Sequence, residues 1–201
     1  ALGPDEIAEL HKAIDFYKDQ GEDPPYQGPY EKKFCDAFSA FMGGGYTDAV
    51  SAGTAGIYVG LKALQLPAGS EVMISPVTDS GPLNCIIEQG LVPVVVDSAP
   101  DSYNVGLQQF NERATPETSA FVIIHAGGEP VSEIAEIAAE AKNRGIKLLE
   151  DCAQAIGAEV NGKKAGRFGD IAAFSTMYRK NLAAGASSGL VYAMDKDLYD
   201  L

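Results

Sequence analysis

The chain has 201 residues, 46% of them hydrophobic and 21% charged, which is typical of a soluble globular protein with a core of useful size. Its formal net charge of −13 argues against a broad nucleic-acid-binding surface, because neutralising phosphates requires lysine and arginine. The charged, amphipathic N-terminus does not resemble a signal peptide, and no apolar run approaches the roughly 18 residues of a membrane-spanning helix.

The first part of the chain predicts two helices. Over residues 5–20, apolar side chains recur at helical spacing on one face: Ile7, Leu10, Ile14 and Tyr17. A connector rich in proline and glycine follows. A second helix is expected over residues 30–42, where phenylalanines recur at helical spacing, and it ends at Gly43-Gly44-Gly45.

From residue 48 onward, strands alternate with helices. The expected strands are Asp48–Val50, Glu71–Ser75, Val92–Val96, Ala120–Ile124, Ile146–Glu150, Ile171–Ser175 and Leu190–Met194. Helices are expected from Thr54, over residues 80–89, and over the run VSEIAEIAAEAKNRG that ends at Gly145; DKDLYDL looks like the start of another. This alternation predicts an α/β domain with a mainly parallel sheet that is buried on both faces.

The segment SAGTAG, Ser51–Gly56, follows a strand and opens a helix. Small residues let a phosphate approach the backbone, and the helix N-terminus offers free N–H groups and a favourable dipole. The Thr54 hydroxyl can add one more hydrogen bond. The alternative is an ordinary strand-to-helix turn in which Thr54 serves as the cap.

Asp151, in IKLLEDCAQ, stands at the carboxyl end of an apolar strand. Ligands of open α/β sheets bind beyond those ends. A carboxylate there can pair with a cationic ring nitrogen. The alternative is a helix cap or a buried salt-bridge partner.

The segment Phe168–Gly185 contains a strand that leads to Ser175 and then Lys180. A lysine just past a buried strand, partly withdrawn from water, can act as nucleophile and base. The alternative is a solvated surface lysine, which is what most lysines are.

The remaining reactive side chains give weaker signals. His125 ends another strand, and a lone histidine is more often structural than catalytic; the chain has only two histidines for a triad or a metal site. Lys163, Lys164 and Arg167 form a small basic cluster, read as a solvated turn or, less favourably, as a contact to an anionic substrate.

The three cysteines are odd in number, widely spaced and without a C-x-x-C pair: Cys35, Cys85 and Cys152. Neither a disulfide framework nor a zinc site is expected. They are interpreted as reduced thiols of a cytosolic protein.

Taken in order, four segments resemble the DegT/DnrJ/EryC1/StrS family of sugar aminotransferases, which depend on pyridoxal 5'-phosphate (PLP). They are SAGTAGI, PVVVDSAPDSYNV, EDCAQAIGAEVNGKKAGRFGD and FSTMYRKNL. The resemblance runs from about residue 24 to 201. It implies a three-layer α/β/α large domain of PLP fold type I with a mainly parallel mixed sheet, preceded by an N-terminal helical segment, 1–23. Family members continue into a smaller C-terminal domain, so this chain is expected to be the cofactor-binding part (24–201) of a longer protein.

The resemblance also implies residue roles. Lys180 would form the internal aldimine with PLP and shuttle the proton, and Asp151 would pair with the pyridine nitrogen; these are the two expected catalytic residues. The other implied cofactor contacts are Gln154 near the PLP hydroxyl, Asp79 beside the ring, and three phosphate-binding residues, Gly53, Thr54 and Ser175. No metal is expected.

The sequence departs from the family pattern at two places. Asp79 stands where the family usually has an aromatic residue that covers one face of PLP, and Gly185-Ala186-Ser187-Ser188 replaces a Gly-Glu-Gly-Gly run. Dehydratases of the family carry histidine at the position of Lys180, so retention of lysine argues against that branch.

The function implied is transfer of an amino group from glutamate or glutamine to a nucleotide-linked keto sugar, by a cytoplasmic homodimer that binds neither nucleic acid nor membrane. Three alternatives stay open at this point: a different PLP reaction, a degenerate PLP-binding protein with a regulatory or assembly role, and a nucleotide-binding doubly wound domain. The last lacks a G-x-G-x-x-G after its first strand, which counts against it.

Overall fold

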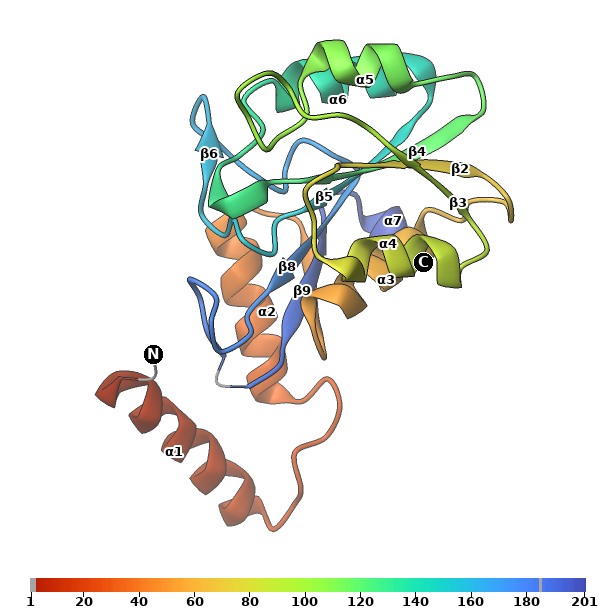
Figure 1. Cartoon of the computed structure of the whole chain (residues 1–201). Coiled ribbons are helices and arrows are strands. Elements are labelled where there is room, and N and C mark those ends of the chain that lie inside the picture. Colours follow the sequence, from red (N-terminus) through yellow and green to blue (C-terminus); the bar gives the residue numbers. More distant parts are fainter. Residues whose placement is uncertain (1–2, 185) are drawn as a thin grey trace.

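A seven-stranded sheet forms the centre of the molecule in the computed structural model, which describes residues 3–184 and 186–201 (Figure 1). The strand order is β1-β9-β8-β5-β4-β2-β3. The strands are β1 (Tyr46–Val50), β2 (Glu71–Ile74), β3 (Val92–Val95), β4 (Thr118–Ile124), β5 (Lys147–Asp151), β8 (Ile171–Ser175) and β9 (Gly189–Ala193). Strand β9 pairs antiparallel with both of its neighbours, whereas the other pairings are parallel, so the predicted mainly parallel sheet is confirmed.

Helices cover both faces of this sheet. The helices of the described residues are α1 (Pro4–Gln20), which stands apart from the sheet, α2 (Pro29–Met42), α3 (Gly53–Ala63), α4 (Ser80–Glu88), α5 (Leu107–Arg113), α6 (Ile134–Arg144) and α7 (Lys196–Tyr199). One core contains Ile57 of α3 and Ile86 of α4 packed on Val122 and Leu149 of the sheet. The opposite face packs against α5 and α6 in a second core and against α2 in a third. Successive side chains along a strand point to opposite faces of the sheet, so each strand contributes to the cores on both sides. Helices packed on these two faces give the three-layer α/β/α architecture.

Four short elements were not expected from the sequence. Helix α5 has seven residues and buries only Phe110, too little apolar periodicity to be recognised. The hairpin of β6 (Glu159–Val160) and β7 (Lys163–Lys164) and the short 3₁₀ helix η1 (Ala126–Gly128) are also too brief for a periodic signal. The helix expected from Val131 begins at Ile134 instead.

Helix α1 forms where it was predicted but buries none of its residues. Its apolar face is open to solvent, with Ile7, Leu10 and Ile14 each 44–53% exposed. Figure 1 shows this helix projecting from the α/β body, to which residues 21–28 connect it. The predicted amphipathic face is therefore real, but in the monomer nothing covers it among the described residues.

All three cysteines are buried and free, as the sequence indicated. Burial raises the pKa of the Cys35 thiol to about 11. The basic cluster lies in and after the β6–β7 hairpin, where Lys164 pairs with Glu159 at 2.7 Å. This placement supports the interpretation as a turn. No helix among the described residues is long and apolar enough to span a membrane.

Candidate functional site

A cavity of about 460 Å³ opens at the carboxyl ends of the strands, on the face covered by α3 and α4. It is lined by the start of α3, the segment before α4, the turn after β4, the end of β5 and the segment after β8. All seven residues proposed from the sequence line it: Gly53, Thr54, Asp79, Asp151, Gln154, Ser175 and Lys180. Segments about 130 residues apart in the sequence thus converge on one site.

The start of α3 forms one end of this cavity. Ala52 occupies the N-cap position and no side chain caps the helix, so the alternative reading of Thr54 as the cap is wrong. Gly53 is required here, because a Cβ atom at this position would lie 2.8 Å from the Ser175 Cβ. The uncapped N–H groups and the helix dipole provide a site suited to an anion.

Ser175 faces this helix start from the end of β8. It is 6% exposed, and no hydrogen bond to its hydroxyl is found within the described part of the chain. A buried hydroxyl without a protein partner is available to a ligand. Together with Thr54 it completes a phosphate-sized polar end of the cavity.

Asp151 presents a buried carboxylate to the same cavity. Its Oδ1 accepts a hydrogen bond from the Ala153 N–H at 2.9 Å, and no donor reaches Oδ2 from the described residues. Burial raises the pKa of Asp151; the Ala153 N–H and the positive charge of nearby Lys180 oppose this shift, and the negative charge of Asp79 adds to it. A cationic partner at the free oxygen would offset the cost of burying this charge.

Lys180 lies in the segment after β8 and is partly buried. Its backbone N–H donates to the Met177 carbonyl at 2.9 Å, which fixes the turn that carries it. No carboxylate within the described ranges lies close enough to form a salt bridge with its ammonium group. It is also the only lysine among the residues that line the cavity, within the described part of the chain.

Asp79 has a local role that the sequence did not reveal. It is the N-cap of α4, and its Oδ1 accepts a hydrogen bond from the Gly81 N–H at 3.0 Å. Aspartate is among the best N-cap residues. The Asp-Ser-Gly sequence at the start of a helix was the signal that could have indicated this.

Gln154 joins two walls of the cavity. Its Oε1 accepts a hydrogen bond from the Gly127 N–H at 2.7 Å and so ties the turn after β4 to the segment after β5.

The segment 185–188, which departs from the family pattern, is described except for Gly185. Ser187 of this segment lines the cavity, and its hydroxyl donates a hydrogen bond to the Ser51 carbonyl at 2.8 Å.

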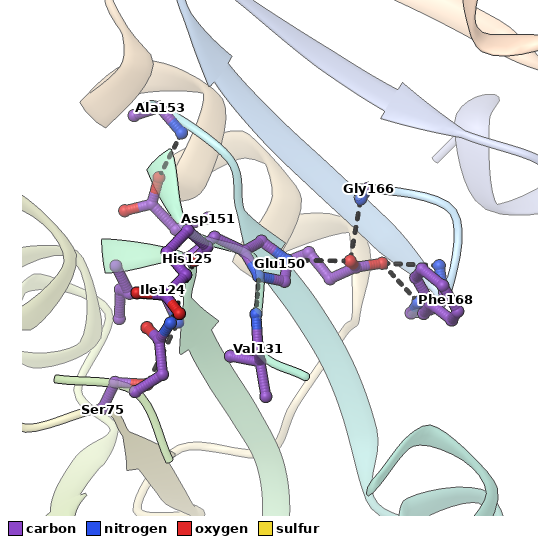
Figure 2. A network of polar contacts seen from close by, with 12 residues as sticks. Ser75, Ile124, His125, Val131, Glu150, Asp151, Ala153, Gly166 and Phe168 are labelled. Carbon is purple, nitrogen blue, oxygen red and sulfur yellow. Dashed lines mark hydrogen bonds and ion pairs between the residues drawn. The ribbon is translucent and has the colours of Figure 1, made fainter. Parts of the chain in front are cut away.

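His125 and Glu150 form a buried polar pair beneath the site, with 3.0 Å between His125 Nε2 and Glu150 Oε2 (Figure 2). Both side chains are 0% exposed. This burial fits the interpretation of His125 as a structural residue. Glu150, which stands next to Asp151, was not predicted from the sequence as a functional residue.

The sulfur of Cys152 lies near this pair, and the three possible ligand atoms are within 4.8 Å of one another. The pair is nevertheless poorly suited to a metal. The Glu150 oxygens and both His125 ring nitrogens are already engaged in hydrogen bonds. Burial also raises the pKa of the Cys152 thiol well above its usual value, which disfavours the thiolate that a metal requires.

Comparisons with known proteins identify the family of this chain and several relatives. The model of the DegT/DnrJ/EryC1/StrS aminotransferase family matches residues 17–201. A GDP-perosamine synthase of Escherichia coli O157:H7 is 33% identical over 174 residues, which are 87% of this chain and 47% of the relative. The chain thus spans about half the length of the curated relatives it matches.

Solved structures show the same arrangement. An aminotransferase from Psychrobacter cryohalolentis superposes with a TM-score of 0.90 at 27% identity, over 99% of this chain and 49% of the other. NtdA of Bacillus subtilis, solved with the cofactor PMP bound, superposes with a TM-score of 0.86 at 28% identity, over 98% of this chain and 44% of the other.

Proposed function

Because the chain belongs to the DegT/DnrJ/EryC1/StrS aminotransferase family, we propose that its protein uses PLP to transfer an amino group from glutamate or glutamine to a nucleotide-linked keto sugar. The predicted fold, the α/β large domain of PLP fold type I, is confirmed by the sheet and by the superposition with an aminotransferase at a TM-score of 0.90. The observation that carries the proposal is the convergence of the seven predicted residues in one cavity.

The cavity fits the three parts of PLP that a protein must hold. The uncapped start of α3, with Thr54 and the Ser175 hydroxyl, for which the described residues offer no hydrogen-bond partner, suits the phosphate. The Oδ2 of buried Asp151, which no donor of the described residues reaches, suits a protonated ring nitrogen. Lys180, without an ion-pair partner among the described residues, suits the aldehyde carbon.

PLP, when bound, supplies an aldehyde carbon that exchanges amines and a ring that accepts the electron pair released at the substrate carbon. Asp151 would keep the ring nitrogen protonated through a charge-assisted hydrogen bond. Lys180 Nζ would hold the cofactor and, when displaced by the incoming amine, would carry the proton between the substrate carbon and the cofactor carbon. Gln154 would lie on the hydroxyl side of the ring.

The substrate class and the assembly belong to the same proposal. The name of the GDP-perosamine synthase relative supports a sugar carried on a nucleotide. The exposed apolar face of α1 supports a homodimer, since a second subunit would remove it from water. The segment 1–23 would then serve assembly, with 24–201 as the cofactor-binding domain, and the three free cysteines support a cytoplasmic location.

The direct test is spectroscopic. The protein incubated with PLP should gain an absorbance band that disappears on borohydride reduction, and the band should convert when glutamate or glutamine is added but not when sodium chloride of equal ionic strength is added. A protein that shows no reducible band does not bind the cofactor as proposed. A reducible band that neither amino donor converts would instead support the degenerate binder.

Asp79 gives a second test, because it combines a position in the cavity with the α4 cap. We expect Asp79→Phe to tighten PLP binding by covering a ring face, and also to lower folding stability by about 0.5–2 kcal/mol through loss of the cap. Asp79→Asn is the matched control, since asparagine caps equally well and adds no aromatic ring. PLP titration and thermal unfolding measure the two effects; an affinity that is unchanged or weaker in Asp79→Phe would show that this side chain does not face the ring.

A further inference from the structure

The turn after β4, which contains η1 and supplies Ala126 and Gly127 to the cavity wall, is held by side chains in addition to its backbone hydrogen bonds. Four backbone N–H groups in and beside this turn donate to side-chain acceptors, three of which come from other segments of the chain. Ser75 accepts from Ile124, Asn104 from Ala126, Gln154 from Gly127 and His125 from Val131, at 2.7–3.0 Å. Figure 2 shows the Ser75 and His125 contacts.

Glu150 holds a second loop in the same way. Its Oε2 accepts from the Gly166 N–H at 2.8 Å and from His125 Nε2 at 3.0 Å. Its Oε1 accepts from the Phe168 N–H at 2.7 Å and the Gly169 N–H at 2.6 Å. Four donors match the four lone-pair positions of an ionised carboxylate, so this buried group is fully satisfied as an anion.

These contacts fix the tautomer of His125. A backbone N–H can only donate, so Nδ1, which receives the Val131 N–H, is an acceptor without a proton. The proton of the neutral ring is therefore on Nε2, from which it is donated to Glu150. The ring thus bridges the β4 turn to the carboxylate that also holds residues 166–169.

The pair lies directly behind Asp151. Successive side chains of a strand point to opposite faces, and Figure 2 shows the Glu150 and Asp151 side chains leaving β5 in opposite directions. The His125 backbone N–H donates to the Asp151 carbonyl at 3.1 Å, so β4 and β5 remain paired at the rim. The contacts that hold Glu150 and His125 on one face therefore also hold the β5 backbone from which the Asp151 side chain projects on the other.

We propose that Glu150 and His125 are positioning residues that orient Asp151 and the Gly127 turn toward the cofactor in the proposed PLP site. The inference rests on the proposed function, because it assigns the pair a purpose at that site. Neither side chain touches the cavity, so both act through other residues. An orienting pair beneath a charged ligand-binding group controls how well that group meets its partner.

The test compares cofactor affinity with folding stability. His125→Phe removes both ring hydrogen bonds at similar volume, and we expect it to weaken PLP binding by about tenfold or more, since a misdirected Asp151 loses a charge-assisted hydrogen bond. Phe110→Leu is the matched control: Phe110 is buried on the same face of the sheet, in α5, and does not line the cavity. It should lower the thermal midpoint but leave PLP affinity within about twofold of wild type.

Two results would overturn the inference while leaving the proposed function intact. One is wild-type PLP affinity in His125→Phe, and the other is an equal loss of affinity in Phe110→Leu. Absence of PLP binding by the wild-type protein would instead refute the proposed function itself.

Nitrogen NMR of the wild-type ring gives a readout that needs no variant and no activity. The spectrum should show His125 protonated at Nε2 and not at Nδ1, and exposed His11 provides the internal comparison. A proton on Nδ1 would contradict the bridge. If His125→Phe does not fold, His125→Asn takes its place: it can keep an acceptor for Val131 but cannot reach Glu150, so it should also bind PLP more weakly, and wild-type affinity in this variant would overturn the inference.

Discussion

Replacement of Lys180 with alanine is expected to abolish covalent attachment of PLP. The reason is positional, because no other lysine of the described residues lines the cavity. Borohydride reduction should fix the cofactor to the wild-type protein, and mass spectrometry should then find it on the peptide that contains Lys180. In Lys180→Ala borohydride should no longer fix the cofactor to the protein, although the phosphate end of the site remains and should still retain PLP noncovalently.

Lys163→Ala and Lys164→Ala are the matched controls for this experiment. Both lysines lie in strand β7, away from the cavity, and Lys164 is already engaged with Glu159. These variants should keep the band and the labelled peptide. Cofactor found on Lys163 or Lys164 of the wild-type protein would overturn the assignment of Lys180.

Replacement of Asp151 with asparagine is expected to leave the fold intact and to lower turnover steeply. Asparagine can still accept the Ala153 N–H, so the local turn is preserved. The neutral amide cannot hold a ring nitrogen in its protonated form. Loss of a charge-assisted hydrogen bond of about 1.5–3 kcal/mol corresponds to a fall of about 10- to 150-fold in PLP affinity, and turnover should fall by at least that factor.

The same substitution should not destabilise the cofactor-free protein. Burial raises the pKa of Asp151 above its ordinary value of 3.8, so the folded state binds this proton more tightly than the unfolded state does. The carboxyl group therefore reduces stability as pH rises above its ordinary pKa, and this cost remains at neutral pH. Asparagine removes the cost, so the thermal midpoint of the apoprotein at pH 7 should stay level or rise.

Turnover with glutamate, PLP titration and thermal unfolding of wild type and Asp151→Asn together test this role. Near-normal turnover in the variant would show that Asp151 does not pair with the ring nitrogen. A large fall in the apoprotein's midpoint would show instead that the carboxylate has a structural role that the folded geometry does not suggest.

Local sequence patterns predicted many of the strands and helices. The apolar runs that form β4 and β8 were predicted nearly to the residue, because a strand buried on both faces leaves a continuous hydrophobic signature in the sequence. The stop of α6 at Gly145 was likewise predicted, since a left-handed residue at the end of a helix favours glycine. The motifs around Asp151 and Lys180 indicated the family before any geometry was known.

By itself, then, the sequence determined the fold class, the family and the seven residues of the candidate site, because each depends on short segments with their own periodicity or motif. Only the tertiary structure decided that Asp79 caps α4, that Glu150 collects N–H groups from residues 16–19 positions later, and that His125 bridges it to the β4 turn. The cap depends on where a helix begins, and the buried pair depends on which backbone groups the folded chain leaves without partners. Neither is encoded in a repeating pattern: a buried polar side chain takes whatever donors the packed neighbours present to it.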